Sequence, residues 1–217
     1  MKDLLEIDGA RLWQSLADMA RIGATPRGGV RRLALTDDDR RGRELFAQWC
    51  RDAGMTVSVD AVGNLCARRE GADAHAAPVL IGSHLDTQPE GGRFDGVYGV
   101  LAALELVRTL NDAGIATDKP IELVSWTNEE GARFAPAMLG SAVFTGALPL
   151  DDALAKQDAE ASRSARHWTP AVIAARARRA ARSMRTSRRI SNRARCWRPT
   201  VRRSASSRAG RRSAGST

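Results

Sequence analysis

A sharp change of composition near Glu160 divides the chain into two segments that cannot fold alike. Residues 161–217 contain 17 Arg, 12 Ala and 10 Ser, and no Lys, Asp, Glu, Leu, Phe or Tyr. This segment has too few large apolar side chains to offset the entropy that is lost on ordering. We therefore predict a folded body over residues 1–160 and a disordered tail, with no domain, over residues 161–217.

The charge of the chain is divided at the same point. The formal net charge is +9, yet residues 1–160 hold the other 17 basic groups against all 25 acidic groups, so the body is acidic. No apolar stretch approaches the roughly 18–20 residues of a membrane helix, and the amino terminus lacks the layout of a secretion signal. The three scattered cysteines, Cys50, Cys66 and Cys196, form no disulfide framework, which favours a reducing cytoplasm.

The body alternates helical and strand-like patterns. Capping residues followed by apolar side chains at helical spacing predict helices after Asp8 and Thr36, and a third helix carries an apolar face from Val97 to Leu110. Four strands are predicted at residues 56–60, 64–68, 79–84 and 121–126. The order strand–helix–strand predicts an α/β fold with a doubly wound sheet flanked by helices.

Acidic and imidazole side chains gather where these strands end. His84 and Asp86 close the third strand, Asp95 lies between a glycine-rich loop and the third helix, and Glu129 and Glu130 follow the fourth strand. Open α/β sheets place their sites at the carboxyl ends of the strands. Histidine together with carboxylates is a ligand set of zinc or manganese, so the pattern predicts a metal site.

Each of these clusters also has an ordinary structural explanation. His84 alone is more often a satisfied structural group, Asp95 beside a glycine can cap the next helix, and Glu129 with Glu130 can form an exposed acidic corner. The coincidence of three such clusters on one sheet favours the metal site over these alternatives.

Four segments of the body together resemble a known enzyme family. They are ARIGATPRGGVRRLALTDDDRRGRELF (20–46), GSHLDT (82–87), GGRFDGVYG (91–99) and SWTNEEGARFAPAMLGS (125–141). Over about residues 9–160 the chain resembles the N-carbamoyl-L-amino-acid hydrolase branch of the dinuclear-zinc, M20-type amidohydrolases and peptidases. That branch also includes allantoate amidohydrolases and β-ureidopropionases. The resemblance implies a zinc-peptidase-like catalytic domain with a mixed sheet flanked by helices, which is incomplete here.

The resemblance implies a role for each clustered side chain. His84 binds one divalent ion, Asp95 bridges two ions, Glu130 binds the second ion, and the ions are zinc or manganese. Glu129 is the general base, and Asp86 is the carboxylate that supports His84. The implied reaction is hydrolysis of an N-carbamoyl-L-amino acid, or a related small ureido substrate, to the amino acid, carbon dioxide and ammonia. Intact members are homodimers, and the dimer-forming domain is missing here.

The family pattern stops where the composition changes. The resemblance implies that AYFEAHIEQGPVLEAD should come next, and its His would ligate the second metal, so that site is incomplete in this chain. Arg189–Thr200 can be back-translated so that reading from the third base of the Arg189 codon gives HIEQGPVLEAD, and Met184–Arg189 likewise gives AYFEA just before it. We interpret residues 161–217 as an out-of-frame translation and expect an inactive or weakly active fragment.

Two other interpretations stay open at this point. The Arg-rich tail, with Trp168 and Trp197, could bind nucleic acid through phosphates. The body could also be a metal-binding relic without activity. The absence of Lys and the hidden motif favour an accidental tail, so we expect at most nonspecific binding to nucleic acid and no membrane partner.

The coding DNA tests the out-of-frame interpretation of the tail. We expect one base gained or lost near codon 160, followed by a hidden frame that encodes AYFEAHIEQGPVLEAD, because shifting the frame of GC-rich DNA generates arginine codons. Sequencing the locus on both strands is the measurement. A frame that runs unbroken through Ala161, with codons that do not spell this motif when shifted, would contradict the interpretation.

Overall fold

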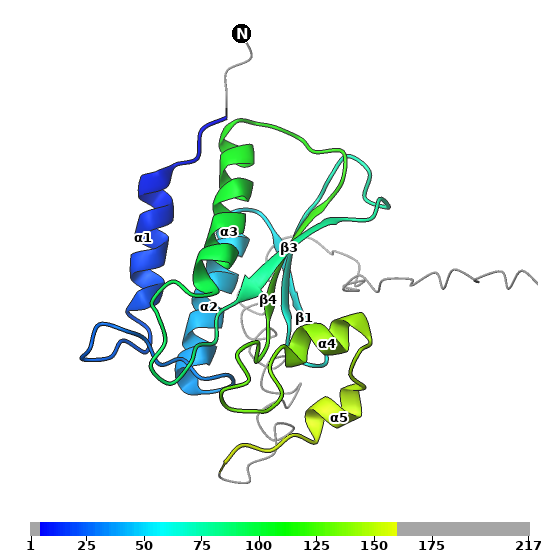
Figure 1. The fold of residues 1–217 in the computed structure, drawn as a ribbon. Coiled ribbons are helices and arrows are strands. Elements are labelled where there is room, and N and C mark those ends of the chain that lie inside the picture. The colour runs from blue at the N-terminus through cyan, green and yellow to red at the C-terminus, as the bar shows by residue number, and fades with distance from the viewer. Residues whose placement is uncertain (1–4, 160–217) are drawn as a thin grey trace, which may run out of the picture.

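Residues 5–159 are the part of the chain that the computed structural model describes, and they build one mixed sheet with helices beside it (Figure 1). The strands are β1 (Thr56–Val59), β2 (Leu65–Arg69), β3 (Val79–His84) and β4 (Ile121–Trp126). The helices are α1 (Gly9–Ala20), α2 (Asp37–Asp52), α3 (Val97–Asp112), α4 (Leu139–Thr145) and α5 (Leu150–Leu154). The strand order is β1-β2-β4-β3, with β3 parallel to β4 and the other two pairs antiparallel.

The first two helices begin where their capping residues predict. The Asp8 carboxylate accepts a hydrogen bond from the Arg11 backbone N–H at 2.9 Å, and the Thr36 hydroxyl accepts one from the Asp39 backbone N–H at 3.3 Å. Such side chains satisfy N–H groups that have no partner within the first turn of a helix. Three aspartates in the first turn of α2 also complement the positive end of its dipole. These local predictions are confirmed.

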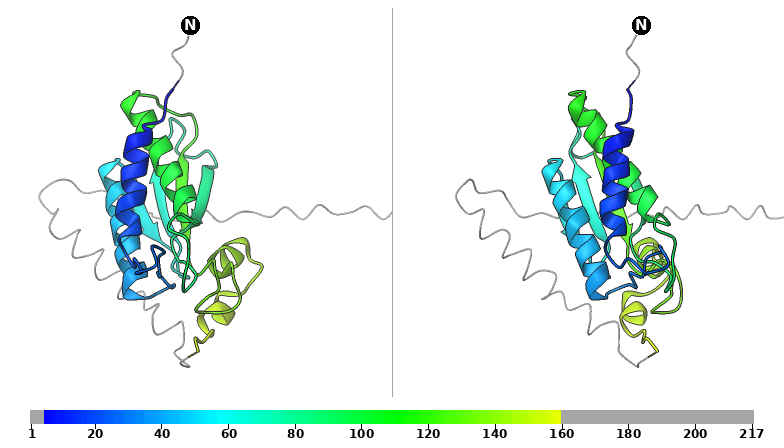
Figure 2. Two further views of the ribbon diagram at one scale, coloured as in Figure 1. Left: turned by 60° about the vertical axis from the view of Figure 1, so that its left-hand side comes forward. Right: turned by 90° about the vertical axis from the view of Figure 1, so that its left-hand side faces the viewer.

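The three long helices lie on one face of the sheet, which differs from the doubly wound arrangement expected from the sequence (Figure 2). Helix α3 packs on β3 and β4, α2 packs on β1 and β2, and α1 packs on α3. Within the described residues, α3 is the one helix that connects two parallel strands. Strands β1 and β2 form an antiparallel hairpin, which needs no crossover helix to cover a second face. The α/β class is confirmed, and the sheet is mixed.

The core lies between this sheet and the three helices. Its buried side chains come from every layer, and they include Met19, Phe46, Leu65, Leu104 and Leu123. Burial of such side chains supplies most of the favourable free energy of folding. The core therefore fixes the sheet against the helices and gives the ends of β3 and β4 a rigid base.

Strand β3 is more exposed than its apolar sequence suggests. It lies at the end of the described sheet, and Val79 is 49% exposed, whereas β4 lies between two neighbours and is buried over its first five residues. No helix between residues 5 and 159 combines the length and the apolar character that crossing a bilayer requires. The disorder that the sequence predicts for residues 161–217 lies outside the described part of the chain.

An ion pair between a partly exposed arginine and a buried glutamate ties α1 to α3. The Glu105 carboxylate of α3 has no exposed surface, and it accepts hydrogen bonds from Arg11 Nε at 3.0 Å and Arg11 Nη2 at 2.6 Å. Arg108 Nη1 lies 3.6 Å from the same carboxylate. The hydrogen bonds with Glu105 raise the pKa of the Arg11 guanidinium above its usual value. A buried carboxylate with this partner positions α1 on α3 in a single orientation.

Replacing Arg11 should therefore destabilise the fold. We expect Arg11→Met to lower the free energy of unfolding by about 3 kcal/mol, because it leaves the buried Glu105 charge with Arg108 alone. The control is Arg27→Met, which removes the exposed Arg27–Glu90 pair and should cost at most about 1 kcal/mol. Urea unfolding of the full chain, followed by circular dichroism, measures both changes. Equal losses in the two variants would contradict the role given to the Arg11–Glu105 pair.

Candidate metal centre

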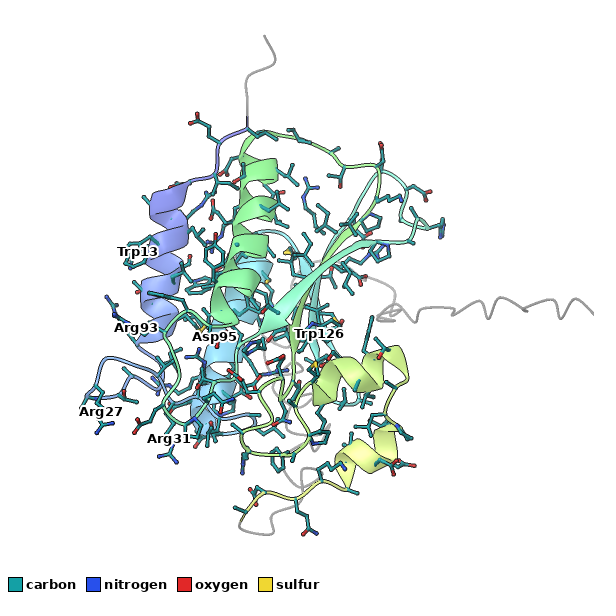
Figure 3. All side chains as sticks on the ribbon, viewed as in Figure 1. Trp13, Arg27, Arg31, Arg93, Asp95 and Trp126 are labelled. Carbon is teal, nitrogen blue, oxygen red and sulfur yellow. The ribbon has the colours of Figure 1, made fainter. Side chains whose placement is uncertain are left out.

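The candidate site lies where β3 and β4 end. His84 is the last residue of β3 and lies opposite Trp126, the last residue of β4, in the parallel register. Because parallel strands run in the same direction, their carboxyl ends meet at one edge of the sheet. Asp95 precedes α3 and reaches the same edge, as its position in Figure 3 shows. The loop after β4 brings Glu129 and Glu130 there as well.

Three of the predicted residues converge as a possible ligand set. One ligand atom each from His84, Asp95 and Glu130 lies within 4.8 Å of the other two. His84 is buried, Glu130 is half-buried and Asp95 is exposed, so the cluster opens to solvent on one side. One imidazole nitrogen and two carboxylate oxygens suit zinc or manganese, so the donor chemistry fits a divalent metal.

The His84 ring is fixed in the tautomer that metal binding requires. Its Nδ1 lies 2.9 Å from the main-chain oxygen of Asp86. A carbonyl oxygen accepts hydrogen bonds and cannot donate them, so Nδ1 carries a hydrogen, and in the neutral ring Nε2 keeps its lone pair. Metal-binding histidines commonly donate their other N–H to a main-chain carbonyl in this way. Nε2 is therefore the nitrogen available to a metal.

The Asp86 carboxylate supports the site differently from what the sequence spacing suggests. Its Oδ1 lies 4.0 Å from His84 Nδ1, whereas its two oxygens accept hydrogen bonds from the backbone N–H groups of Glu129 and Glu130, each at 3.2 Å. Strand β3 ends at His84, so the alternation of an extended strand does not continue to Asp86. Asp86 holds His84 through its main-chain oxygen, and its carboxylate holds the loop after β4.

Burial governs the electrostatics of Asp86. Desolvation, together with the charge of Asp39, raises the pKa of its carboxyl to about 6. The neighbouring His84 and the two backbone N–H groups oppose this rise. The carboxylate is thus stabilised by the same contacts that order the loop.

A further contact orders the side chain of Glu130. Gln88 Nε2 donates a hydrogen bond to Glu130 Oε2 at 2.7 Å. The amide leaves the second carboxylate oxygen of Glu130 available to a metal. Glu129 lies beside it, with its Oε2 3.4 Å from His84 Nε2.

Asn128 shapes the turn that presents Glu129 and Glu130, and the sequence analysis missed it. It is wholly buried and has φ of +53°, in the left-handed region that Asn adopts more readily than most residues. Its side-chain amide donates to the Phe134 carbonyl at 2.6 Å, and its oxygen accepts from the Phe134 N–H at 3.3 Å. An Asn directly after a buried strand and before paired carboxylates was the available signal.

Gly96 is a second residue that the sequence analysis did not assign to the site. Its φ is +67°, and a Cβ atom at this position would fall on the His84 imidazole. The backbone before α3 can therefore approach His84 only where a side chain is absent. The Asp95–Gly96 pair at the start of a helix was the signal for this requirement.

Comparison with known proteins finds a family that is similar to the part of the chain around this site. The model of peptidase family M20/M25/M40 matches residues 80–176, a range that begins in β3 and covers every candidate site residue. The matched range is less than half of the chain, and this part is similar to the family. Enzymes of the M20 family are generally metal-dependent, which agrees with the His84, Asp95 and Glu130 cluster.

Several relatives are closely similar over the body of the chain. An N-carbamoyl-L-amino-acid amidohydrolase of Rhizobium meliloti is 56% identical over 154 residues, which cover 71% of this chain and 37% of that protein. A ureidoglycolate hydrolase of Arabidopsis thaliana is 33% identical over 150 residues, 69% of this chain and 32% of that protein.

A solved structure shows the same fold. A hydantoinase/carbamoylase family amidase from Burkholderia ambifaria is 91% identical, with a TM-score of 0.74, over 75% of this chain and 40% of that one. The chain thus spans well under half the length of the M20 relatives it matches.

Adding one methyl group at Gly96 should block the metal site. We expect Gly96→Ala to weaken binding of zinc at least tenfold, because its Cβ would displace the His84 imidazole. The matched control is Gly92→Ala in the same loop, where a Cβ would meet no atom within 4 Å. Isothermal titration of the full chain measures the affinities, and circular dichroism verifies folding. Equal affinity in the two folded variants would contradict this geometry.

Proposed function

We propose that this chain carries the metal-binding part of a hydrolase that cleaves a non-peptide C–N bond. The substrate is an N-carbamoyl-L-amino acid or a related small ureido compound. The convergence of His84, Asp95 and Glu130 at the ends of β3 and β4 carries the proposal. The names of the similar proteins, an N-carbamoyl-L-amino-acid amidohydrolase and a ureidoglycolate hydrolase, support this substrate class.

The proposed ligand roles are those that the family resemblance implies, and the convergence of the three side chains supports them. His84 would hold one divalent ion through Nε2, Asp95 would bridge two ions with its two oxygens, and Glu130 would hold the second ion. Zinc and manganese both suit this donor set. When bound, such ions lower the pKa of a coordinated water and polarise the carbonyl of the substrate.

Glu129 is the proposed general base. Its carboxylate lies next to the metal-facing nitrogen of His84, and 31% of its side chain is exposed, so a water molecule can reach it. Asp86 is 3% exposed, and its carboxylate is engaged by two backbone N–H groups, so it is a positioning residue. Glu129 would accept a proton from the attacking water and pass it to the leaving nitrogen.

The second metal site is the part of the proposal that depends on the tail. By resemblance, its histidine belongs to the motif hidden in the shifted frame at Arg189 and Ile190. The chain as written should therefore bind one ion more tightly than two and show weak or absent turnover. Restoring the frame should supply the missing ligand.

The test uses the frame-restored protein beside the full chain as given. With zinc or manganese, we expect the restored protein to release ammonia from an N-carbamoyl-L-amino acid or from ureidoglycolate. Glu129→Gln should lower kcat at least a thousandfold and leave the metal content unchanged, because the amide keeps the size of the side chain but cannot take a proton. Ammonia release and elemental analysis are the two measurements.

Glu90→Gln is the matched control, since it changes an exposed glutamate that pairs with Arg27. It should leave kcat unchanged. The proposal is wrong if the restored protein holds metal but hydrolyses no ureido substrate. If Glu129→Gln has the same kcat as Glu90→Gln, Glu129 is not the general base.

A further inference from the structure

An arginine is wholly buried directly behind the candidate metal centre. Arg32 has no exposed surface, and it is among the largest fully buried side chains of the described residues. Its Nε donates a hydrogen bond to the Leu85 carbonyl at 2.7 Å. Its Nη1 donates to the carbonyls of Ile22 at 2.8 Å and Met19 at 3.3 Å. The guanidinium therefore joins the end of α1 to the residue between His84 and Asp86.

The backbone of Arg32 is attached to the same segment. Its N–H donates to the Thr87 hydroxyl at 2.8 Å, and its carbonyl accepts from the Thr87 N–H at 2.9 Å. Two residues earlier, Val30 exchanges both backbone hydrogen bonds with Gly91, each at 3.0 Å. The chain from Leu85 to Gly91, which leads out of the site, is thus held along its length by the segment around Arg32.

Helix α2 leaves space for this side chain. A Cβ at Gly42 would lie 3.0 Å from Arg32 Cδ and 3.3 Å from Met19 Sδ. Glycine inside a helix costs about 1 kcal/mol relative to alanine. Glycine at position 42 thus lowers the stability of α2 but leaves space for the Arg32 side chain.

The burial of this cation needs a specific reason. Desolvation lowers the pKa of Arg32, and the carboxylates of Asp39, Asp86 and Asp38 oppose this effect. Its Nη2 has no hydrogen-bond partner among the described residues. An apolar side chain of similar volume often fills such a space at no loss of stability, so stability alone does not account for an arginine.

We propose that Arg32 is a positioning residue of the metal site, which fixes the Leu85 carbonyl and thereby the Leu85–Asp86 peptide group. The orientation of this peptide places the Asp86 main-chain oxygen under His84 Nδ1 and the Asp86 carboxylate under the backbone of Glu129 and Glu130. One guanidinium thus sets the orientation of the imidazole and the position of the loop after β4. The inference rests on the proposed function in so far as the metal site is concerned.

The test compares Arg32→Met and Arg32→Lys with the unchanged full chain. Arg32→Met should weaken binding of Co²⁺ about tenfold or more and change the visible absorption of the bound ion, because the imidazole loses its fixed orientation. Arg32→Lys should recover part of the affinity, since one ammonium donor can reach the Leu85 carbonyl but cannot also reach both carbonyls at the end of α1. Titration followed by absorption gives both readouts.

The control for a purely structural effect is Val107→Ala. Val107 is wholly buried in the core on the later half of α3, more than two helical turns from the end of α3 that begins at the site, and its truncation opens a cavity there. This variant should unfold at a lower temperature and keep the Co²⁺ affinity and spectrum of the unchanged chain. If Arg32 has only a structural role, Arg32→Met should behave like Val107→Ala, with a lower melting temperature and unaltered Co²⁺ binding.

A second variant keeps the inference testable if the Arg32 variants do not fold. Gly42→Ala strengthens the intrinsic helix propensity of α2 but presses on Arg32 Cδ, so it should also weaken Co²⁺ binding. Long-range ¹H–¹⁵N spectra of the metal-free chain add a readout that needs no metal. The His84 signals of the unchanged chain should show hydrogen on Nδ1, and the Arg32 and Gly42 variants should lose this single tautomer.

The outcomes separate the inference from the proposed function. Unaltered Co²⁺ affinity and His84 tautomer in folded Arg32 or Gly42 variants would overturn the role of Arg32. Absence of Co²⁺ binding by the unchanged chain would overturn the metal site instead. In that case the His84 tautomer of the same variants still decides whether Arg32 positions the ring.

Discussion

The parallel pairing of β3 with β4 is the constraint on which the candidate site depends. The register sets His84 opposite Trp126, so the last residue of one strand and the loop of the other meet at one edge of the sheet. Helix α3 connects the two strands and starts at this edge, which brings Asp95 to it. A shift of this pairing by one residue would turn His84 to the other face of the sheet.

Behind the exposed carboxylates lies a layer of buried polar groups. Asp86, Arg32 and Asn128 are all almost or wholly inaccessible to solvent. Asp86 and Arg32 are hydrogen-bonded to main-chain atoms of distant segments, and Asn128 is hydrogen-bonded to main-chain atoms of its own loop. Removing such groups from water is costly unless hydrogen bonds replace the lost hydration. Once these bonds are made, they leave few alternative positions for the loops, which is what a metal site of defined geometry requires.

The similar proteins extend well beyond what this chain matches. Their shared region includes β3, β4 and the candidate ligands, and the family model continues to residue 176, beyond the described residues. Identity of 56% with an amidohydrolase and 91% with a solved amidase is concentrated in this one part of those proteins. The chain therefore matches one part of these longer proteins, and the candidate ligands lie within the range that the family model matches.

The sequence by itself determined the local structure and the kinds of ligand. Asp8 and Thr36 marked the first two helices. Alternating side chains marked β1 and β2, and apolar runs marked β3 and β4. His84, Asp95 and Glu130 were recognisable because they follow strands or precede a helix. Each of these signals is local, because it depends on residues that lie close together in the sequence. The tertiary structure alone decided that the long helices share one face, that Asp86 binds the loop after β4, and that Arg32 and Gly96 bear on His84. These features join segments up to some tens of residues apart, and no local pattern of side chains encodes which distant backbone atoms will meet.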